Sequence, residues 1–259
     1  MVAKALTIAG SDSGGGAGIQ ADLKAFSAMG VYGASVVTAI TAQNTKAVTA
    51  IHAVPDDVVA AQIEAVLTDI QIDAIKIGML GTPSLIEAVS EALKDYGGSI
   101  VLDPVMVAKS GDTLLADSAI DALKEHLVSR ASLLTPNLPE AEKLAGPGEI
   151  AAQAEALLAL GAGAVLMKGG HAKGDVCTDL LFVDGQVRRL ETPRIATQNT
   201  HGTGCSYSSA IAANLAKGLE LNDAVQDAHA WLHQAILRAD DLEVGQGHGP
   251  VHHFHELWG

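Results

Sequence analysis

The sequence predicts an α/β fold of three layers, α-β-α, in which helices cover both faces of a mostly parallel sheet. Short apolar runs alternate with longer segments of helical periodicity, the arrangement that builds parallel sheets with right-handed crossovers. Hydrophobic residues make up 48% of the chain but aromatic residues only 3%. Small aliphatic side chains must therefore fill the core, as in strands buried on both faces. A length of 259 residues suits one domain, residues 1–259.

Six apolar runs are the expected strands of the parallel sheet. Each ends close to a Gly, Pro or Asp, and they cover residues 5–9, 35–39, 74–77, 100–102, 133–135 and 164–167. One region departs from the alternation. Residues 177–183 and 186–191 flank Asp184-Gly185, a dipeptide typical of two-residue turns, and they predict a small β-hairpin.

The clearest helix begins at Pro55, because proline and acidic residues are favoured in a first helical turn. Its apolar positions follow helical spacing: Val59, Ile63, Val66, Leu67 and Ile70. Further helices are expected at residues 19–29, 84–93, 118–127, 151–160, 206–217 and 223–239. Ligands of such folds bind beyond the carboxyl ends of the strands, so functional residues are sought in the loops there.

Charge and cysteine content exclude several classes of protein. The net charge of −14 argues against nucleic acid or an anionic membrane surface as a partner. Cys177 and Cys205 are too few for a disulfide framework or a four-cysteine zinc site. No apolar run reaches membrane-spanning length, and the first residues lack a signal-peptide pattern. We expect a cytoplasmic protein that binds small molecules.

The first strand is followed by a glycine-rich loop, with five glycines in residues 10–18. It is not a dinucleotide-binding fingerprint, because Ile19 stands where the third glycine belongs. It is not a Walker A loop either, because Gly16-Ala17 replaces the Lys-Ser/Thr pair. A flexible turn is the alternative, but so many glycines cost backbone entropy that a plain turn does not need. The loop therefore favours a ligand contact.

A second glycine-rich stretch, residues 199–205, precedes the helix expected at 206–217. Backbone N–H groups at a helix start bind anions, and Gly202 and Gly204 would let a ligand approach closely. Cys205 would feel the positive end of the helix dipole, so we expect a lowered thiol pKa. From the loop alone, a glycine-rich turn with a buried cysteine is an equal alternative.

Other strand ends carry polar side chains. Gln43 offers a donor and an acceptor side by side, which matches an aminopyrimidine edge, although a solvated loop glutamine fits the spacing equally. Asp103 suits metal or phosphate binding, or simple loop capping. Asn137 and Glu140 are oxygen ligands of the kind Mg²⁺ takes, unless Asn137 is only an N-cap. Lys168 would meet phosphate oxygens or extend to solvent. Together these groups are typical of phosphoryl transfer from a metal–nucleotide complex.

At this point the chain resembles a known family. The similarity lies in residues 5–12, 18–22, 42–45, 77–80, 102–105, 135–140, 168–171 and 201–205, in order over residues 4–239. These stretches are similar to hydroxymethylpyrimidine/phosphomethylpyrimidine kinases of the ribokinase-like superfamily. The resemblance implies a ribokinase-like fold and phosphorylation that depends on ATP and Mg²⁺. The substrates would be 4-amino-5-hydroxymethyl-2-methylpyrimidine and then its monophosphate, in thiamine biosynthesis. The expected assembly is a homodimer.

The resemblance also implies roles for individual residues. The aminopyrimidine would be bound by Gln43, in a pocket lined by Gly10, Ala17, Met79 and Val105. The ATP phosphates would meet Lys168 and Thr203, and Mg²⁺ would be organised by Asn137 and Glu140 with Asp103 nearby. Cys205 would follow the anion hole of Gly202 and Gly204, at a position where most ribokinase-like enzymes have an Asp as catalytic base. It would accept the proton of the hydroxyl group, or it would only shape the pocket.

Two other functions remain open from the sequence. Pyridoxal kinases share the fold, and Gln43 and Cys205 favour the aminopyrimidine over the pyridoxal ring. A catalytically silent binding protein would be expected to lack part of the phosphate machinery, which is present here. The histidines of residues 247–256 match no standard metal pattern. We expect that segment to be exposed or to pack at an interface, anchored by Phe254 and Trp258.

Overall fold

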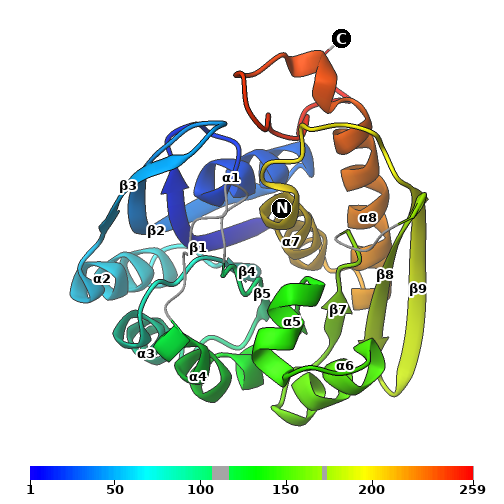
Figure 1. The fold of residues 1–259 in the computed structure, drawn as a ribbon. Helices are drawn as coiled ribbons and strands as arrows, with labels where there is room; N and C mark the ends of the chain where they lie inside the picture. The colour runs from blue at the N-terminus through cyan, green and yellow to red at the C-terminus, as the bar shows by residue number, and fades with distance from the viewer. Residues whose placement is uncertain (107–116, 171–173, 259) are drawn as a thin grey trace.

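A computed structural model describes residues 1–106, 117–170 and 174–258 (Figure 1). In these ranges one nine-stranded sheet has the order β3-β2-β1-β4-β5-β6-β7-β8-β9. The pairings from β2 to β7 are parallel, whereas β3, β8 and β9 are added antiparallel. The strands are β1 (Lys4–Asp12), β2 (Tyr32–Gln43), β3 (Val48–Ala53), β4 (Ala74–Ile77), β5 (Ser99–Leu102), β6 (Leu133–Leu134), β7 (Val165–Met167), β8 (Val176–Val183) and β9 (Gln186–Pro193).

Helices form the two outer layers. They are α1 (Gly18–Ala28), α2 (Asp56–Leu67), α3 (Pro83–Ala92), α4 (Asp117–His126), α5 (Leu138–Ala145), α6 (Ile150–Ala159), α7 (Thr203–Ala216) and α8 (Leu221–Leu237). One apolar cluster joins the sheet to α2–α6, and a second joins it to α1, α7 and α8. In Figure 1, α7 lies near the centre of the view, between α1 and α8. The three-layer α/β fold expected from the sequence is confirmed.

The expected elements are found, with two additions. Strand β3 was not predicted, because its side chains are mostly exposed and it lacks a buried apolar run. Helix α5 was also not predicted as an element, although its start at Asn137 was suspected. The hairpin is present, and it extends the main sheet as β8 and β9. No helix in the described ranges is long and apolar enough to cross a membrane.

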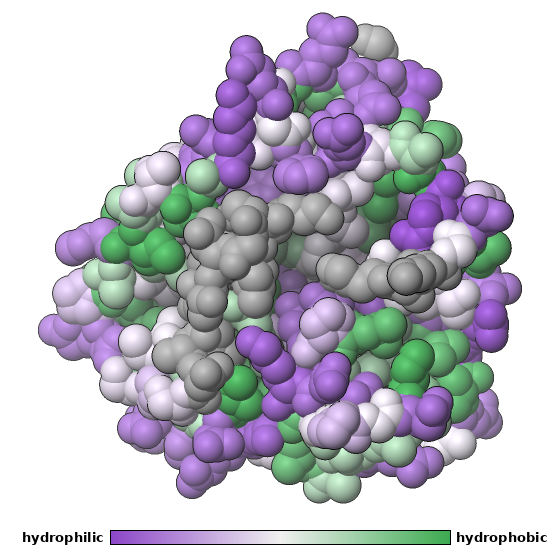
Figure 2. Space-filling view, in the orientation of Figure 1, coloured by the Kyte–Doolittle hydropathy of each residue, from purple (hydrophilic) through white to green (hydrophobic). Residues whose placement is uncertain are grey.

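The face in Figure 2 is largely hydrophilic around its outer rim. Apolar residues gather at its left, over β3 and α2. Ile40, Ile51 and Val58 are among the exposed hydrophobic side chains of these elements and the neighbouring β2. Exposed apolar side chains therefore lie along the edge of the sheet at β3.

Candidate active site

One pocket, with a volume of about 830 Å³, lies beyond the carboxyl ends of the parallel strands. All the residues singled out from the sequence line it: Gly10, Ala17, Gln43, Met79, Asp103, Val105, Asn137, Glu140, Lys168, Gly202, Thr203, Gly204 and Cys205. These residues come from loops spread over most of the chain. The sheet brings them together because the ends of its parallel strands meet at one edge. His171, part of one motif, lies outside the described residues.

One end of the pocket is built by the two glycine-rich loops, which interlock. The Asp12 carboxylate accepts hydrogen bonds from the backbone N–H groups of Gly14, Gly16 and Ala17 at 2.8–3.1 Å. A Cβ on Gly202 would lie 1.8 Å from the carbonyl oxygen of Gly16, and Gly202 has a φ of +77°. Only glycine fits there, because a side chain would meet backbone and would strain that conformation. The loops thus hold each other in place.

The side chains of His201 and Gln43 extend the hydrogen-bond network at this end of the pocket. Nε2 of His201 lies 2.8 Å from Oδ2 of Asp12 and 3.3 Å from Nε2 of Gln43. Thr41 contacts the other side of the Gln43 amide, with 3.1 Å between Oγ1 and Oε1. Burial raises the pKa of Asp12, but the hydrogen bonds from His201 and from the backbone of Ala17 outweigh it, so the pKa is lowered overall. Asp12 is therefore a carboxylate.

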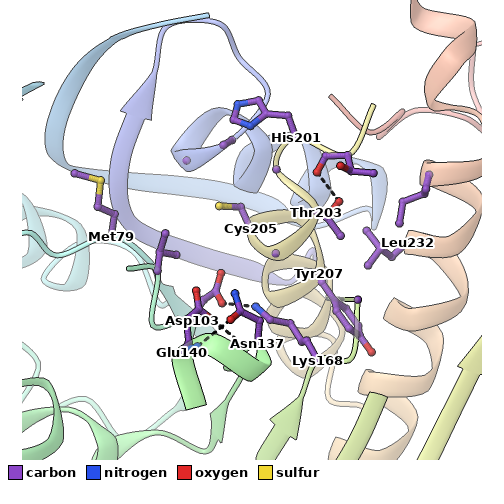
Figure 3. Close-up of a pocket in the computed structure, with 18 of the residues that line it drawn as sticks. Met79, Asp103, Asn137, Glu140, Lys168, His201, Thr203, Cys205, Tyr207 and Leu232 are labelled. Atoms are coloured by element: carbon purple, nitrogen blue, oxygen red, sulfur yellow. Dashed lines mark hydrogen bonds and ion pairs between the residues drawn. The ribbon is translucent and has the colours of Figure 1, made fainter. Parts of the chain in front are cut away.

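The other end of the pocket is charged. Nζ of Lys168 lies 2.7 Å from Oδ1 of Asp103, and both side chains are almost fully buried. Burial lowers the pKa of Lys168, but Asp103 and then Glu140 raise it above its usual value. Figure 3 shows Asp103, Asn137, Glu140 and Lys168 gathered below Cys205. This arrangement places a buried cation among two carboxylates and an amide.

Asn137 is the N-cap of α5, and it forms a capping box with Glu140. Each side chain accepts a hydrogen bond from the backbone N–H of the other, at 2.8–2.9 Å. The N-cap alternative from the sequence is thus correct, but it leaves lone pairs on both side chains. Burial, aided by Asp103, raises the pKa of Glu140 to about 7, although Lys168 opposes the shift. The charged form of Glu140 is therefore disfavoured in a site that already holds the Lys168–Asp103 pair.

These residues fit a magnesium ion that arrives with a nucleotide. In the described ranges no group of three or more His, Cys, Asp or Glu side chains is placed to hold a metal by itself. Mg²⁺ is commonly held by one or two carboxylates together with water and substrate phosphates. Glu140 and Asp103 supply two such carboxylates at the charged end, and a cation there would lower the raised pKa of Glu140.

The expectation of a lowered thiol pKa for Cys205 is wrong. Cys205 lies in the first turn of α7, as anticipated, but burial raises its thiol pKa to about 11. The Lys76 ammonium lowers the pKa, whereas Asp22 and Asp103 raise it. The helix start is too small an effect to reverse the loss of hydration. Cys205 is a neutral thiol at physiological pH.

A buried ion pair beneath the pocket was missed by the sequence analysis. Both oxygens of Asp22 lie 2.9 Å from Nζ of Lys76, and neither side chain is exposed. Thr7 and Ser209 also donate hydrogen bonds to Asp22, at 2.6 and 2.7 Å. The pair ties α1, β4 and α7 together. No local sequence pattern predicts this ion pair, because the four residues are distant in sequence.

An apolar end of the pocket was also missed. It is lined by the hydrophobic side chains of Ile195, Leu232 and Ile236. Leu232 and Ile236 are one turn apart on α8, so they face the same way. Tyr207 lies between this end and Lys168 (Figure 3). The pocket thus has an apolar compartment beside its charged one.

The histidine-rich tail, expected to be exposed or to pack at an interface, packs against the body of the chain. Val251, His252 and His253 are buried, and Ser206 on α7 contacts Nε2 of His253 at 2.8 Å. Phe254 and Trp258 instead stack on each other, with ring centroids 4.9 Å apart. The backbone N–H of His201 also donates to Gly249 O at 3.0 Å. The tail therefore braces the loop that carries His201.

The phosphomethylpyrimidine kinase family model matches residues 12–252. The chain belongs to the phosphomethylpyrimidine kinase family. Among curated relatives, a hydroxymethylpyrimidine/phosphomethylpyrimidine kinase of Rhizobium meliloti is 56% identical, over 100% of this chain and 99% of its own. Members of the family are phosphotransferases, so the chain is an enzyme of that class.

Solved structures support the ribokinase-like fold of this phosphomethylpyrimidine kinase family member. A Bacillus subtilis pyridoxal kinase in complex with ADP has a TM-score of 0.91 and 37% identity, with 100% of both chains covered. A Clostridium difficile phosphomethylpyrimidine kinase has a TM-score of 0.79 and 44% identity, covering 90% of this chain and 99% of that one. The fold is therefore shared by kinases that are named for two different rings.

Proposed function

We propose that the chain phosphorylates 4-amino-5-hydroxymethyl-2-methylpyrimidine with ATP, and then its monophosphate to the diphosphate, in thiamine biosynthesis. The observation that carries the proposal is the division of one pocket into two polar ends. Gln43 offers a donor–acceptor pair at one end, and Lys168 lies among carboxylates at the other. Cys205 lies between His201 and Asp103 in Figure 3. The R. meliloti relative carries both activities in its name.

Each end has a role in the proposed reaction. Gln43 binds the aminopyrimidine edge, with Gly10, Ala17, Met79 and Val105 around the ring. Lys168 and Thr203 bind ATP phosphates, and the apolar end on α8 accepts the nucleotide base. Backbone N–H groups of the Gly202–Gly204 loop stabilise the charge on the transferring group. Asn137, Glu140 and Asp103 would hold Mg²⁺, which neutralises phosphate charge when bound.

We assign the role of proton acceptor in the first step to Cys205. A thiol with a pKa of about 11 is ionised in roughly one molecule in ten thousand at neutral pH. The assignment is compatible with phosphoryl transfer, because a loose transition state asks little of a base. In the second step a phosphate oxygen is already the nucleophile, so Cys205 contributes less there.

The proposal also covers the domain organisation, the oligomeric state and the cellular location of the enzyme. The nine strands of one sheet support a single kinase domain over residues 1–259. The apolar rim at β3 supports a homodimer, and the supply of ATP supports a cytoplasmic location. Size-exclusion chromatography with light scattering tests the dimer, which a monomer at micromolar concentration would contradict.

Pyridoxal kinase is the second candidate, favoured by the TM-score of 0.91 to the B. subtilis enzyme of that name. The deciding experiment measures kcat/KM for the aminopyrimidine alcohol and for pyridoxal, with ATP and Mg²⁺ in both assays. We expect a preference of at least about tenfold for the aminopyrimidine, since a matched hydrogen-bonding edge is worth roughly that much or more. A preference for pyridoxal overturns the proposal.

A further inference from the structure

Three side chains meet around one nitrogen at the Gln43 end of the pocket. Nε2 of His201 lies 2.8 Å from Oδ2 of Asp12 and 3.3 Å from Nε2 of Gln43. On the far side of the Gln43 amide, Oε1 lies 3.1 Å from Oγ1 of Thr41. Counting the hydrogens available to these groups determines which way the amide of Gln43 must face.

The hydrogen between Asp12 and His201 can be covalently bound to only one of the two side chains. Asp12 already accepts hydrogen bonds from Gly14, Gly16 and Ala17, as an ionised carboxylate does. A carboxylate only accepts, so Nε2 of His201 must carry the hydrogen and donate it. The same nitrogen has no lone pair left to accept a hydrogen bond. The amide nitrogen of Gln43, itself a donor, therefore has nothing to bond to on that side.

On the other side of the Gln43 amide, Thr41 also faces a group of the same hydrogen-bonding kind. Its hydroxyl has one hydrogen, and Ser11 O lies 2.9 Å from Oγ1, closer than the amide oxygen of Gln43 at 3.1 Å. If the hydrogen goes to Ser11, two oxygens without a hydrogen face each other. A half-turn of the Gln43 amide resolves both conflicts. Its oxygen then becomes a second, weaker acceptor of the Nε2 hydrogen of His201, which it shares with Asp12 in a bifurcated bond, and its nitrogen donates to Thr41.

The groups that hold His201 leave it little freedom. A Cβ on Gly16 would lie 2.3 Å from Cδ2 of His201, so the ring is pressed against the first glycine loop. Its backbone is bonded on both sides to the tail, through Gly249 O at 3.0 Å and the N–H of Val251 at 3.4 Å. The His201 side chain is nearly buried. The ring thus presents its Nε2 hydrogen in a fixed direction.

We propose that Asp12 and His201 are positioning residues that, together with Thr41, lock the Gln43 amide with its oxygen toward His201 and its nitrogen toward Thr41. The inference rests on the proposed role of Gln43 in binding the ring. It makes the pocket directional: the ligand edge must carry a donor on the His201 side and an acceptor on the Thr41 side. An exocyclic amino group beside a ring nitrogen has that pattern. The 4-oxo analogue, with a carbonyl beside a ring N–H, has the reverse.

The test compares the amino substrate with its 4-oxo analogue in four proteins: wild type, His201→Leu, His201→Gln and Thr41→Val. Wild type is expected to prefer the amino compound by about tenfold to hundredfold in kcat/KM, because each mismatched group is left without a partner. His201→Leu frees the amide to turn, so the preference falls to within about threefold. His201→Gln keeps an N–H donor and retains most of the preference. Thr41→Val should also reduce the preference for the amino compound, and it provides the test if His201→Leu does not fold.

A loss of activity on both compounds by the same factor in His201→Leu and Thr41→Val would mean that these residues only support the fold, and would overturn the inference. Equal use of the two compounds by wild type would also overturn it. The KM for ATP is measured alongside and should stay unchanged. If wild type phosphorylates neither compound, the proposed function fails. Calorimetric titration of the two compounds then still tests the direction of Gln43.

Discussion

The two polar ends of the pocket satisfy their side chains in different ways. At the Gln43 end, Asp12 is held by backbone N–H groups and His201, and interlocking glycines fix the loops. At the Lys168 end, charged side chains hold one another: Lys168 pairs with Asp103, and the pKa of Glu140 is raised to about 7. The first end is rigid before any ligand arrives. The second is a set of charges that a bound phosphate and cation would rearrange.

From this difference we infer that the Gln43 end selects the ring and the Lys168 end serves phosphoryl transfer. Preorganised hydrogen bonds discriminate between rings, because a mismatched ligand cannot induce the loops to adapt. Exchangeable ion pairs suit a step in which charge moves between groups. Substitutions at the rigid end should therefore alter stability and substrate choice, while those at the charged end should alter turnover and pH dependence.

The largest effect is expected from Lys168→Met. The charged end would lose its cation, and kcat/KM should fall by about a thousandfold, measured in a coupled ATP assay. Lys217→Met, at the exposed C-terminal end of α7, is the matched control and should leave kcat/KM unchanged. A Lys168 variant with activity within tenfold of wild type would contradict the role of that end in transfer.

Next in size is Gly202→Ala, which tests the rigid end. Both Gly202 and Gly218 have positive φ, but only at Gly202 would a Cβ meet backbone. Gly218→Ala should cost about 1 kcal/mol of unfolding free energy, and Gly202→Ala at least about 3 kcal/mol. Urea denaturation of both variants gives the difference. Equal costs would show that the loops do not interlock as described.

Gln43→Ala should raise the KM for the aminopyrimidine by about ten- to a hundredfold, because the ring loses its donor–acceptor partner. The KM for ATP should hardly change, because ATP is assigned to the opposite end. Steady-state kinetics with each substrate varied in turn provides both values. Equal losses for the two substrates would remove Gln43 from its assigned role.

Cys205→Ser should slow the first phosphorylation about tenfold more than the second, since only the first must release a hydroxyl proton. With the thiol pKa at about 11, the wild-type rate of the first step should also rise with pH between 7 and 9. That slope should be absent from Cys205→Ser. If both steps fall together in single-turnover assays, Cys205 is not the proton acceptor.

The last effect is on stability and appears only at high pH, from Glu140→Gln, which keeps the capping box. The pKa of Glu140 lies above its ordinary value of 4.5 in the folded chain, so the folded state binds the proton more tightly. Its contribution is present below pH 4.5 and is lost as pH rises toward 7. The variant should therefore be more stable at pH 8 by about 1–3 kcal/mol, and equal near pH 4.5. Glu142→Gln, exposed on the same helix, should show no such change in thermal melts.

The sequence was enough to place the site but not to describe its electrostatics. Residues such as Gln43, Asp103 and Lys168 follow strands, and the rule for parallel sheets brings strand ends together. The pKa of Cys205 was predicted in the wrong direction, because the helix start is visible in sequence whereas burial is a property of the assembled fold. Lys76 went unnoticed for the same reason, since its partner Asp22 lies on another element.

The roles of Asp12 and His201 illustrate a second limit. Both stand in motifs that the sequence analysis used, yet their contact joins residues 189 positions apart. Glycines gave the only local signal, and it indicated close approach without saying to what. Strand β3 was missed because it is exposed. The burial of His252 and His253 was missed because Phe254 and Trp258 were expected to be the anchors of the tail.

The interlock between the two glycine loops also bears on how the chain acquires its fold. Contacts between residues so distant in sequence carry a high entropic cost of loop closure, and they tend to form late. The apolar clusters on α2–α6 join elements that are mostly neighbours along the chain. During synthesis that half can assemble while the loop bearing His201 is still to be made. The end of the pocket that selects the ring is thus expected to be the last part of the enzyme to mature.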